Sequence, residues 1–200
     1  MSILIKSATL VDSKSNLNFK KKDILIKDGV IVDIADTIDT NANQIFDFEN
    51  LHVSKGWMDT SVSFGEPGYE ERETLDNGLS TAGLSGFSQI ALNPNTNPVI
   101  DNQSAVSFLK QAASNTATQI APIASFSKKQ EGKQLTELYD LQQSGAVAYG
   151  DYKKPIENAE LLKIGLQYAQ RLNGLILSTP ADRNIGNKSG VHEGKVSTRN

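Results

Sequence analysis

The sequence of 200 residues contains no cysteine and only two histidines. Without cysteine the chain can form neither disulfides nor thiolate zinc sites, and it has no cysteine nucleophile. Two histidines cannot furnish a histidine-based metal site by themselves. The lack of cysteine fits a reducing compartment, and we expect the protein to be cytoplasmic.

Long apolar runs and a strong charge of one sign are also absent. No stretch approaches the roughly 20 apolar residues of a membrane span, and the apolar run in Met1–Lys6 is too short for a signal-peptide core. The formal net charge is −3 and the lysines are scattered, so neither nucleic acid nor a membrane is an expected partner. The hydrophobic content of 38% is enough for a domain with a real core.

The first fifty residues read as short strands joined by turns. Asp28-Gly29 predicts a hairpin, because both residues tolerate the positive φ of a tight type I′ turn. We therefore expect a small β-domain over residues 1–54. Its predicted strands are Ile3–Ile5 with Thr9–Val11, Ile24–Ile26, Val30–Ile34 and Gln44–Phe48.

From about Lys55 strands and helices alternate, which is typical of βα units and a parallel sheet. Asp101 is the expected N-cap of a helix carrying Ala105, and Leu161, Ile164, Tyr168 and Leu172 give a later helix one apolar face. The predicted strands are Trp57–Asp59 with Val62, Phe87–Leu92, Gln119–Ala124, Ala146–Tyr149 and Leu175–Leu177.

The predicted fold is α/β: a small N-terminal β-sandwich portion, then residues 55–200 as the first part of a (βα)8 barrel of the TIM type. About five βα units fall in this range. A complete barrel typically needs about 250 residues, so we expect the chain to be a fragment of one.

Catalytic groups of such barrels lie on the loops at the carboxyl ends of the strands. The first of these loops carries Asp59-Thr60-Ser61-Val62-Ser63-Phe64-Gly65-Glu66-Pro67-Gly68, and the second Pro94-Asn95-Thr96-Asn97-Pro98. These segments resemble dihydroorotases of the amidohydrolase superfamily, cyclic amidohydrolases close to allantoinases and hydantoinases. That family typically shows Asp-x-His-x-His-x-Arg-Glu-Pro-Gly and Pro-Asn-Thr-x-Pro. Further matches are Lys133–Leu138, Gly145–Ala148 and Val191–Arg199.

The resemblance implies a metal-dependent hydrolase, but the chain departs from the family at the metal ligands. Ser61 and Ser63 stand where the family has two histidines, and Ser178 where it has a third. Gly65 stands where the family has the arginine that grips the substrate carboxylate. A hydroxyl is a poor replacement for imidazole on zinc, and glycine offers no charged fork to a carboxylate.

Two polar residues of the family site remain. Asp151 aligns with a carboxylate of the metal site, and it is a weak catalytic candidate whose alternative is a remnant or a loop-capping group. Asn95 aligns with a substrate-binding asparagine, and its alternative is ordinary turn chemistry. For Ser61 and Ser63 the alternative is a strand-end hydroxyl, and for His52 and His192 a structural role.

Zinc at a hydrolytic site normally needs about three protein ligands, which Asp151 alone cannot supply. We therefore expect no cofactor, or zinc only if ligands from the remaining strands compensate for the loss.

The leading hypothesis is a catalytically inactive dihydroorotase homologue, a pseudoenzyme with a binding or assembly role related to pyrimidine biosynthesis. Its partner, by the family resemblance, is aspartate transcarbamoylase or a second copy in a homo-oligomer. The alternative is an active or weakly active cyclic amidohydrolase that binds a small cyclic ureide and hydrolyses a cyclic amide bond. A third possibility is a purely structural oligomer subunit.

Overall fold

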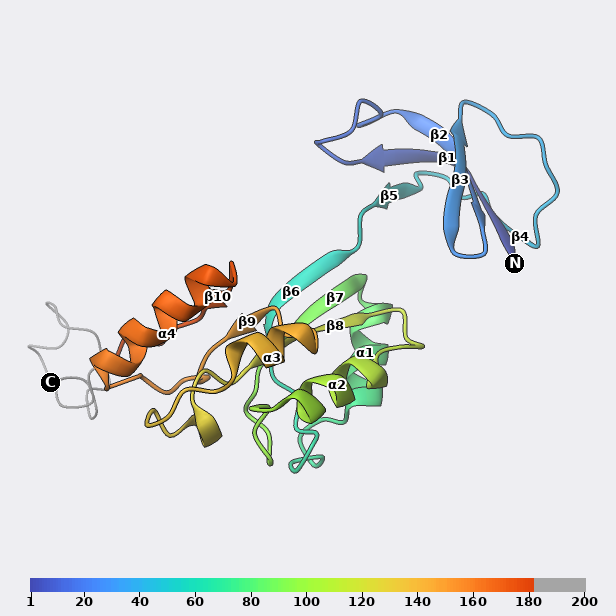
Figure 1. Cartoon of the computed structure of the whole chain (residues 1–200). Helices are drawn as coiled ribbons and strands as arrows, with labels where there is room; N and C mark the ends of the chain where they lie inside the picture. Colours follow the sequence, from blue (N-terminus) through green and yellow to red (C-terminus); the bar gives the residue numbers. More distant parts are fainter. Residues whose placement is uncertain (182–200) are drawn as a thin grey trace, which may run out of the picture. The chain divides into compact units, whose positions relative to one another are not determined.

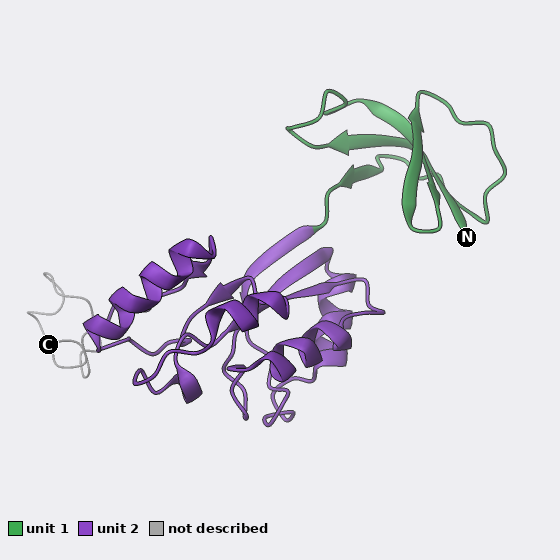
Figure 2. Cartoon of the chain, in the orientation of Figure 1, with its two compact units in different colours: residues 1–56 green, residues 57–200 purple. Residues whose placement is uncertain are grey.

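The computed structural model describes residues 1–181 of the chain. The chain divides into two compact units, which Figure 2 distinguishes by colour. The first unit spans Met1–Gly56 and the second begins at Trp57. This division falls close to the end of the β-domain that we expect at residue 54.

The first unit is built on a mixed five-stranded sheet. In it, β2 pairs antiparallel with both β1 and β3, whereas β4 and β5 run parallel to β1. Leu4, Leu25 and Ile38 form its small core. The strands are β1 (Ser2–Val11), β2 (Lys21–Lys27), β3 (Val30–Ala35), β4 (Gln44–Phe46) and β5 (His52–Ser54).

The hairpin between β2 and β3 confirms the predicted tight turn. Asp28 has a φ of 49° and Gly29 a φ of 80°, as a type I′ turn requires. The two strands predicted around Ile3 and Thr9 are one strand in the structure. A change of register between Ile5 and Ala8, where Ser7 has a φ of 50°, interrupts the apolar pattern and explains the apparent gap.

The second unit contains a five-stranded parallel sheet in the order β10-β9-β8-β7-β6 (Figure 1). Neighbours in the sheet are therefore neighbours in the sequence, as expected for consecutive βα units. This arrangement confirms the predicted parallel sheet. The strands are β6 (Trp57–Val62), β7 (Phe87–Leu92), β8 (Gln119–Ala124), β9 (Ala148–Tyr149) and β10 (Leu175–Ile176).

Helices between these strands bury the main core of the unit. In sequence order, α1 (Leu75–Leu84) packs on β7, α2 (Gln103–Ala112) on β8 and α4 (Ala159–Arg171) on β10. A short 3-10 helix η1 (Lys128–Gln130) and α3 (Leu138–Gln143) lie between β8 and β9. The core includes the fully buried Leu79, Leu92, Leu109, Ile120, Phe126 and Tyr149.

Two details of the helices differ from the sequence-based expectation. Asn102, not Asp101, is the N-cap of α2: its side-chain oxygen accepts from the backbone N–H of Ala105 at 3.1 Å. Asp101 instead accepts from the backbone N–H of Lys129 at 3.0 Å, which ties the loop after β8 to the start of α2. Leu161 and Tyr168 of α4 and its C-cap Leu172 pack on the core, but Ile164 is 49% exposed.

None of the helices within residues 1–181 is both long enough and apolar enough to span a membrane.

Candidate functional site

A pocket of about 210 Å³ lies at the carboxyl ends of the parallel strands. Because those ends meet at one edge of the sheet, residues far apart in the sequence share its wall. Ser61 comes from β6, and Ser178 lies just after β10. The structure thus brings together two of the three serines that the sequence singles out. The remaining lining residues are Asn93, Ile123, Gly150, Tyr152, Lys153, Leu177 and Thr179.

Ser61 is held in place by its neighbours on two strands. The side-chain amide of Asn93, a buried residue directly after β7, donates to the Ser61 hydroxyl oxygen at 3.1 Å and to the Val62 carbonyl at 2.9 Å. The backbone N–H of Ser61 donates to the Asp59 carboxylate at 3.0 Å. The bond from Asn93 uses an acceptor position of Ser61, so the hydroxyl proton can donate into the pocket.

Ser63 and Asn95 form a pair beside this pocket rather than in its wall. The Asn95 side-chain amide donates to the Ser63 hydroxyl oxygen at 2.7 Å, and the Ser63 hydroxyl lies 3.1 Å from the Asn95 side-chain oxygen. The two candidates therefore lie side by side, on the loops that follow β6 and β7. Each side chain satisfies polar atoms of the other.

Asp151 is buried with 4% of its surface exposed, and its carboxylate faces the loop after β8. One oxygen accepts from the Ser125 hydroxyl at 2.8 Å and from the backbone N–H of Ser127 at 3.0 Å. The other oxygen accepts from the Ser127 hydroxyl. Ser127 is itself linked to Gly132, whose N–H donates to its hydroxyl oxygen at 2.8 Å. These hydrogen bonds tie the Asp151 carboxylate to the loop after β8.

Gly65 occupies a position where no side chain fits. A Cβ atom added there would lie 1.7 Å from the Tyr69 carbonyl oxygen and 3.2 Å from that of Glu73. The loop closes around this residue, since Gly65 donates its N–H to Glu73 at 2.9 Å and accepts from the N–H of Tyr69 at 3.0 Å. The backbone of the loop thus fills the space that an arginine at this position would need.

The residues of the pocket do not fit a zinc ion. The polar side chains of its described lining are hydroxyls, one amide and one ammonium group, whereas zinc in proteins is bound by imidazole, thiolate or carboxylate. Within residues 1–181 no group of three or more histidine, cysteine, aspartate or glutamate side chains is placed to hold a metal. His52 is exposed, with its Nδ1 2.7 Å from the Asn50 carbonyl oxygen. His192 and the segment Val191–Arg199 lie outside the described residues.

The sequence-based reasoning did not single out Asn93, Tyr152, Lys153 or Thr179 as pocket residues. The sequence could have indicated Asn93, because this residue directly follows the apolar run of β7 and so stands at the carboxyl end of a strand. Lys153 follows a candidate residue by only two positions. Its orientation depends on a turn, in which the N–H of Lys154 donates to the Asp151 carbonyl at 2.7 Å.

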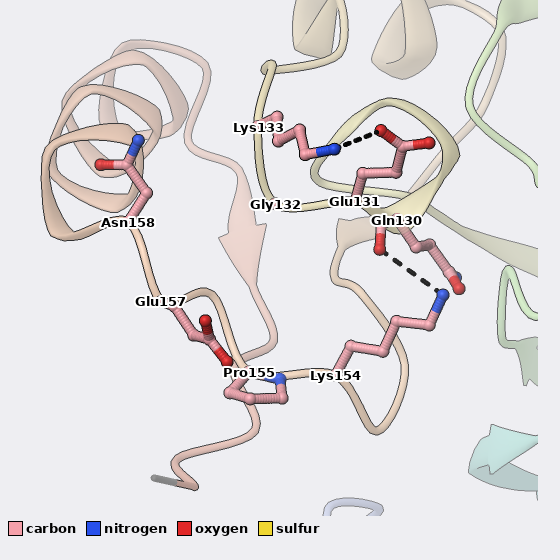
Figure 3. Close-up of a pocket in the computed structure, with 8 residues that line it drawn as sticks. All are labelled: Gln130, Glu131, Gly132, Lys133, Lys154, Pro155, Glu157 and Asn158. Atoms are coloured by element: carbon pink, nitrogen blue, oxygen red, sulfur yellow. Dashed lines mark hydrogen bonds and ion pairs between the residues drawn. The ribbon is translucent and has the colours of Figure 1, made fainter. Parts of the chain in front are cut away.

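A second pocket, of about 620 Å³, lies between the segment around η1 and the segment that leads into α4 (Figure 3). Its charges are mixed. Lys133 pairs with Glu131 at 3.4 Å, and the Lys154 ammonium donates to the Gln130 carbonyl oxygen at 3.5 Å. None of the candidate residues from the sequence lines it. We therefore regard the smaller pocket at the strand ends as the candidate site.

The sequence of the chain matches a known protein family. A family model described as Dihydro-orotase-like matches residues 51–200. The chain belongs to this dihydroorotase-like family. The match confirms the resemblance seen in the loops after β6 and β7.

Curated relatives and a solved structure agree with this assignment. The chain is 36% identical to a dihydroorotase of Pelotomaculum thermopropionicum and covers 46% of that protein with 99% of its own length. It is 35% identical to a dihydroorotase of Syntrophus aciditrophicus and covers 47% of it with 99% of its own length. The chain thus spans about half the length of these relatives.

The fold itself matches that of the L-hydantoinase (dihydropyrimidinase) of Arthrobacter aurescens, with a TM-score of 0.70 at 21% identity. The match covers 87% of this chain and 39% of that one. Together with the parallel sheet, this likeness confirms the predicted α/β fold, in which the second unit is the first part of an amidohydrolase barrel.

Proposed function

We propose that the protein is a dihydroorotase homologue without hydrolytic activity, which serves a binding or assembly role related to pyrimidine biosynthesis in the cytoplasm. The observation that carries this proposal is the chemistry of the pocket at the strand ends. Ser61, Asn93 and Ser178 line it, and none of these side chains can replace an imidazole on zinc. Without a metal, a water molecule in this pocket keeps its ordinary high pKa and is a poor nucleophile.

The arrangement of Asp151 supports the same proposal. A carboxylate that accepts three hydrogen bonds from Ser125 and Ser127 would have to give up some of them to bind a metal or move a proton. Because the residue is buried, the donors left behind would also lose their partner.

The loop at Gly65 provides a third, independent argument. Its backbone fills the space beside this residue, so an arginine that binds a substrate carboxylate has no room there unless the loop rearranges. A substrate would therefore have to be held by other groups.

The test is hydrolysis of dihydroorotate by the purified full-length protein, with zinc added and with zinc removed by a chelator. We expect the background rate in both cases, and a dihydroorotase such as the Pelotomaculum thermopropionicum relative serves as the positive control. The double variant Ser61→His with Ser63→His should stay inactive, because the family's third histidine and its arginine are still replaced by Ser178 and Gly65. Zinc-dependent turnover by the unaltered protein would contradict the proposal and favour the alternative, a cyclic amidohydrolase that binds a small cyclic ureide.

For the assembly role we propose aspartate transcarbamoylase, or a second copy of the chain, as the partner. The support is the family resemblance. Light scattering coupled to size-exclusion chromatography, on the protein alone and mixed with that enzyme, tests both partners. If the protein is a monomer and does not co-elute with the enzyme, both proposed partners are wrong.

A further inference from the structure

We propose that the pocket at the strand ends binds a small oxyanion, a carboxylate or a phosphate, through the Lys153 ammonium group and the hydroxyls of Ser61 and Ser178. This inference rests on the proposed function, since it assigns an anion to the place where a hydrolytic relative would need a metal cation.

The charge of the pocket is the first argument. Among the nine described residues that line it, Lys153 is the one with a charged side chain. Its ammonium nitrogen lies 5.0 Å from the centre of the Tyr152 ring, another wall residue. Within residues 1–181 no carboxylate forms an ion pair with it. Among the described lining residues the pocket therefore carries one positive charge without an ion-pair partner, on a side chain that is exposed to solvent.

The two nearby carboxylates do not cancel this charge inside the pocket. Asp151, two residues before Lys153, is 4% exposed and is turned toward Ser125 and Ser127. Asp59 accepts the backbone N–H of Ser61 and is absent from the pocket wall. Both negative groups are thus held by hydrogen bonds of their own.

The hydroxyls supply the neutral donors that an oxyanion needs. Ser61 accepts from Asn93, which leaves its proton free to donate, and Ser178 and Thr179 enter the same pocket from the segment after β10, the last strand in the sheet order. Hydrogen bonds from such groups and from an ammonium group to a charged oxygen are about twice as strong as neutral ones. A carboxylate or phosphate can accept several of them at once.

The size of the pocket limits what it can hold. Its volume of about 210 Å³ is room for several water molecules. Sites for drug-sized ligands and cofactors are about 300–1,000 Å³. A pocket of this size suits a small anion such as a carboxylate or a phosphate.

The turn that carries Lys153 holds it at the pocket wall. Lys153 has a φ of 57°, a conformation that residues other than glycine adopt rarely, and the bond from Lys154 to the Asp151 carbonyl closes the turn. Asp151 is fixed by the neighbouring loop, and the side chains of Lys153 and Lys154 line different pockets. Lys153 lines this pocket and Lys154 the larger one.

The test is isothermal titration of the chelator-treated full-length protein at constant ionic strength, with inorganic phosphate in one arm and malonate in the other. We expect saturable binding at one site for at least one of the two anions, and the tighter one identifies the ligand chemistry. Lys153→Met should weaken binding at least tenfold, while the matched control Lys154→Met should change it less than twofold. Ser178→Asp, which lies outside the turn, should weaken binding as strongly by adding a negative charge.

Circular dichroism of each variant confirms that it is folded before titration. Absence of saturable binding of both anions, or equal weakening by Lys153→Met and Lys154→Met, would overturn the anion site and leave the proposed function standing. Binding that appears only when zinc is added back would overturn both, because a metal would then hold the anion.

Discussion

The replacement Asp151→Ala should destabilise the protein by about 2–6 kcal/mol. The Ser125 hydroxyl keeps a second acceptor, the Ser127 carbonyl at 2.6 Å, but the N–H and the hydroxyl of Ser127 lose theirs. Each buried donor left without a partner costs about 1–3 kcal/mol, which gives the range for two of them. Asp151→Asn keeps one acceptor oxygen, so it should cost about half as much.

Urea unfolding of the full-length protein measures this change as a shift of the midpoint at constant slope. The exposed neighbour provides the control, since Lys154→Met should stay within about 0.5 kcal/mol of the unaltered protein. The loss should be the same with and without a chelator, because the carboxylate fixes a loop and holds no metal. A loss for Asp151→Ala below about 0.5 kcal/mol, or one that depends on zinc, would refute this reasoning.

Two further predictions concern the core. Tyr149→Phe should cost about 1 kcal/mol in urea unfolding, because the Leu138 carbonyl loses the hydroxyl that donates to it at 2.9 Å. Burial raises the pKa of Tyr149 above its ordinary value of 10.0. The contribution of this hydroxyl to the free energy of unfolding is therefore complete below about pH 10 and falls as the pH rises further. If the unfolding midpoint of Tyr149→Phe fell as steeply with pH as that of the unaltered protein, this explanation would be wrong. Gly165→Ala should destabilise α4 by about 1–3 kcal/mol despite the better helix propensity of alanine, because its Cβ would lie 2.2 Å from the Phe126 ring. Urea unfolding measures this change as well, and Gln167→Ala, at an exposed position of the same helix, should be neutral in it. A stabilised Gly165→Ala variant would show that the Phe126 ring can move aside.

The apolar runs of the second unit predicted its strands well. The runs at Phe87–Leu92 and Gln119–Ala124 coincide with β7 and β8, because the carboxyl-terminal halves of both strands are apolar and buried in the parallel sheet. The short strand β5 went unpredicted, since His52–Ser54 shows no apolar pattern and is defined by its pairing with β1.

The N-cap of α2 was misplaced by one residue. Both Asp101 and Asn102 have suitable side chains, and only the contact of Asp101 with Lys129, from a distant loop, decides between them.

The candidate site could be predicted only in part. The family pattern and the rule for strand ends place Ser61 and Ser178 at one edge of the sheet, where the structure has them. The direction of the Asp151 side chain could not be predicted, because it depends on Ser125 and Ser127 in another loop. The position of Lys153 in the pocket wall likewise depends on a turn with a positive φ, which a lysine does not indicate in a sequence.

The most direct test of the account is the zinc content of the full-length protein, measured by elemental analysis after incubation with excess zinc and removal of the unbound metal. Serines at positions 61, 63 and 178, together with a carboxylate engaged elsewhere, predict well below one equivalent of zinc per chain. One or two tightly bound equivalents, lost when Asp151 is replaced by alanine in a variant that remains folded, would contradict the account.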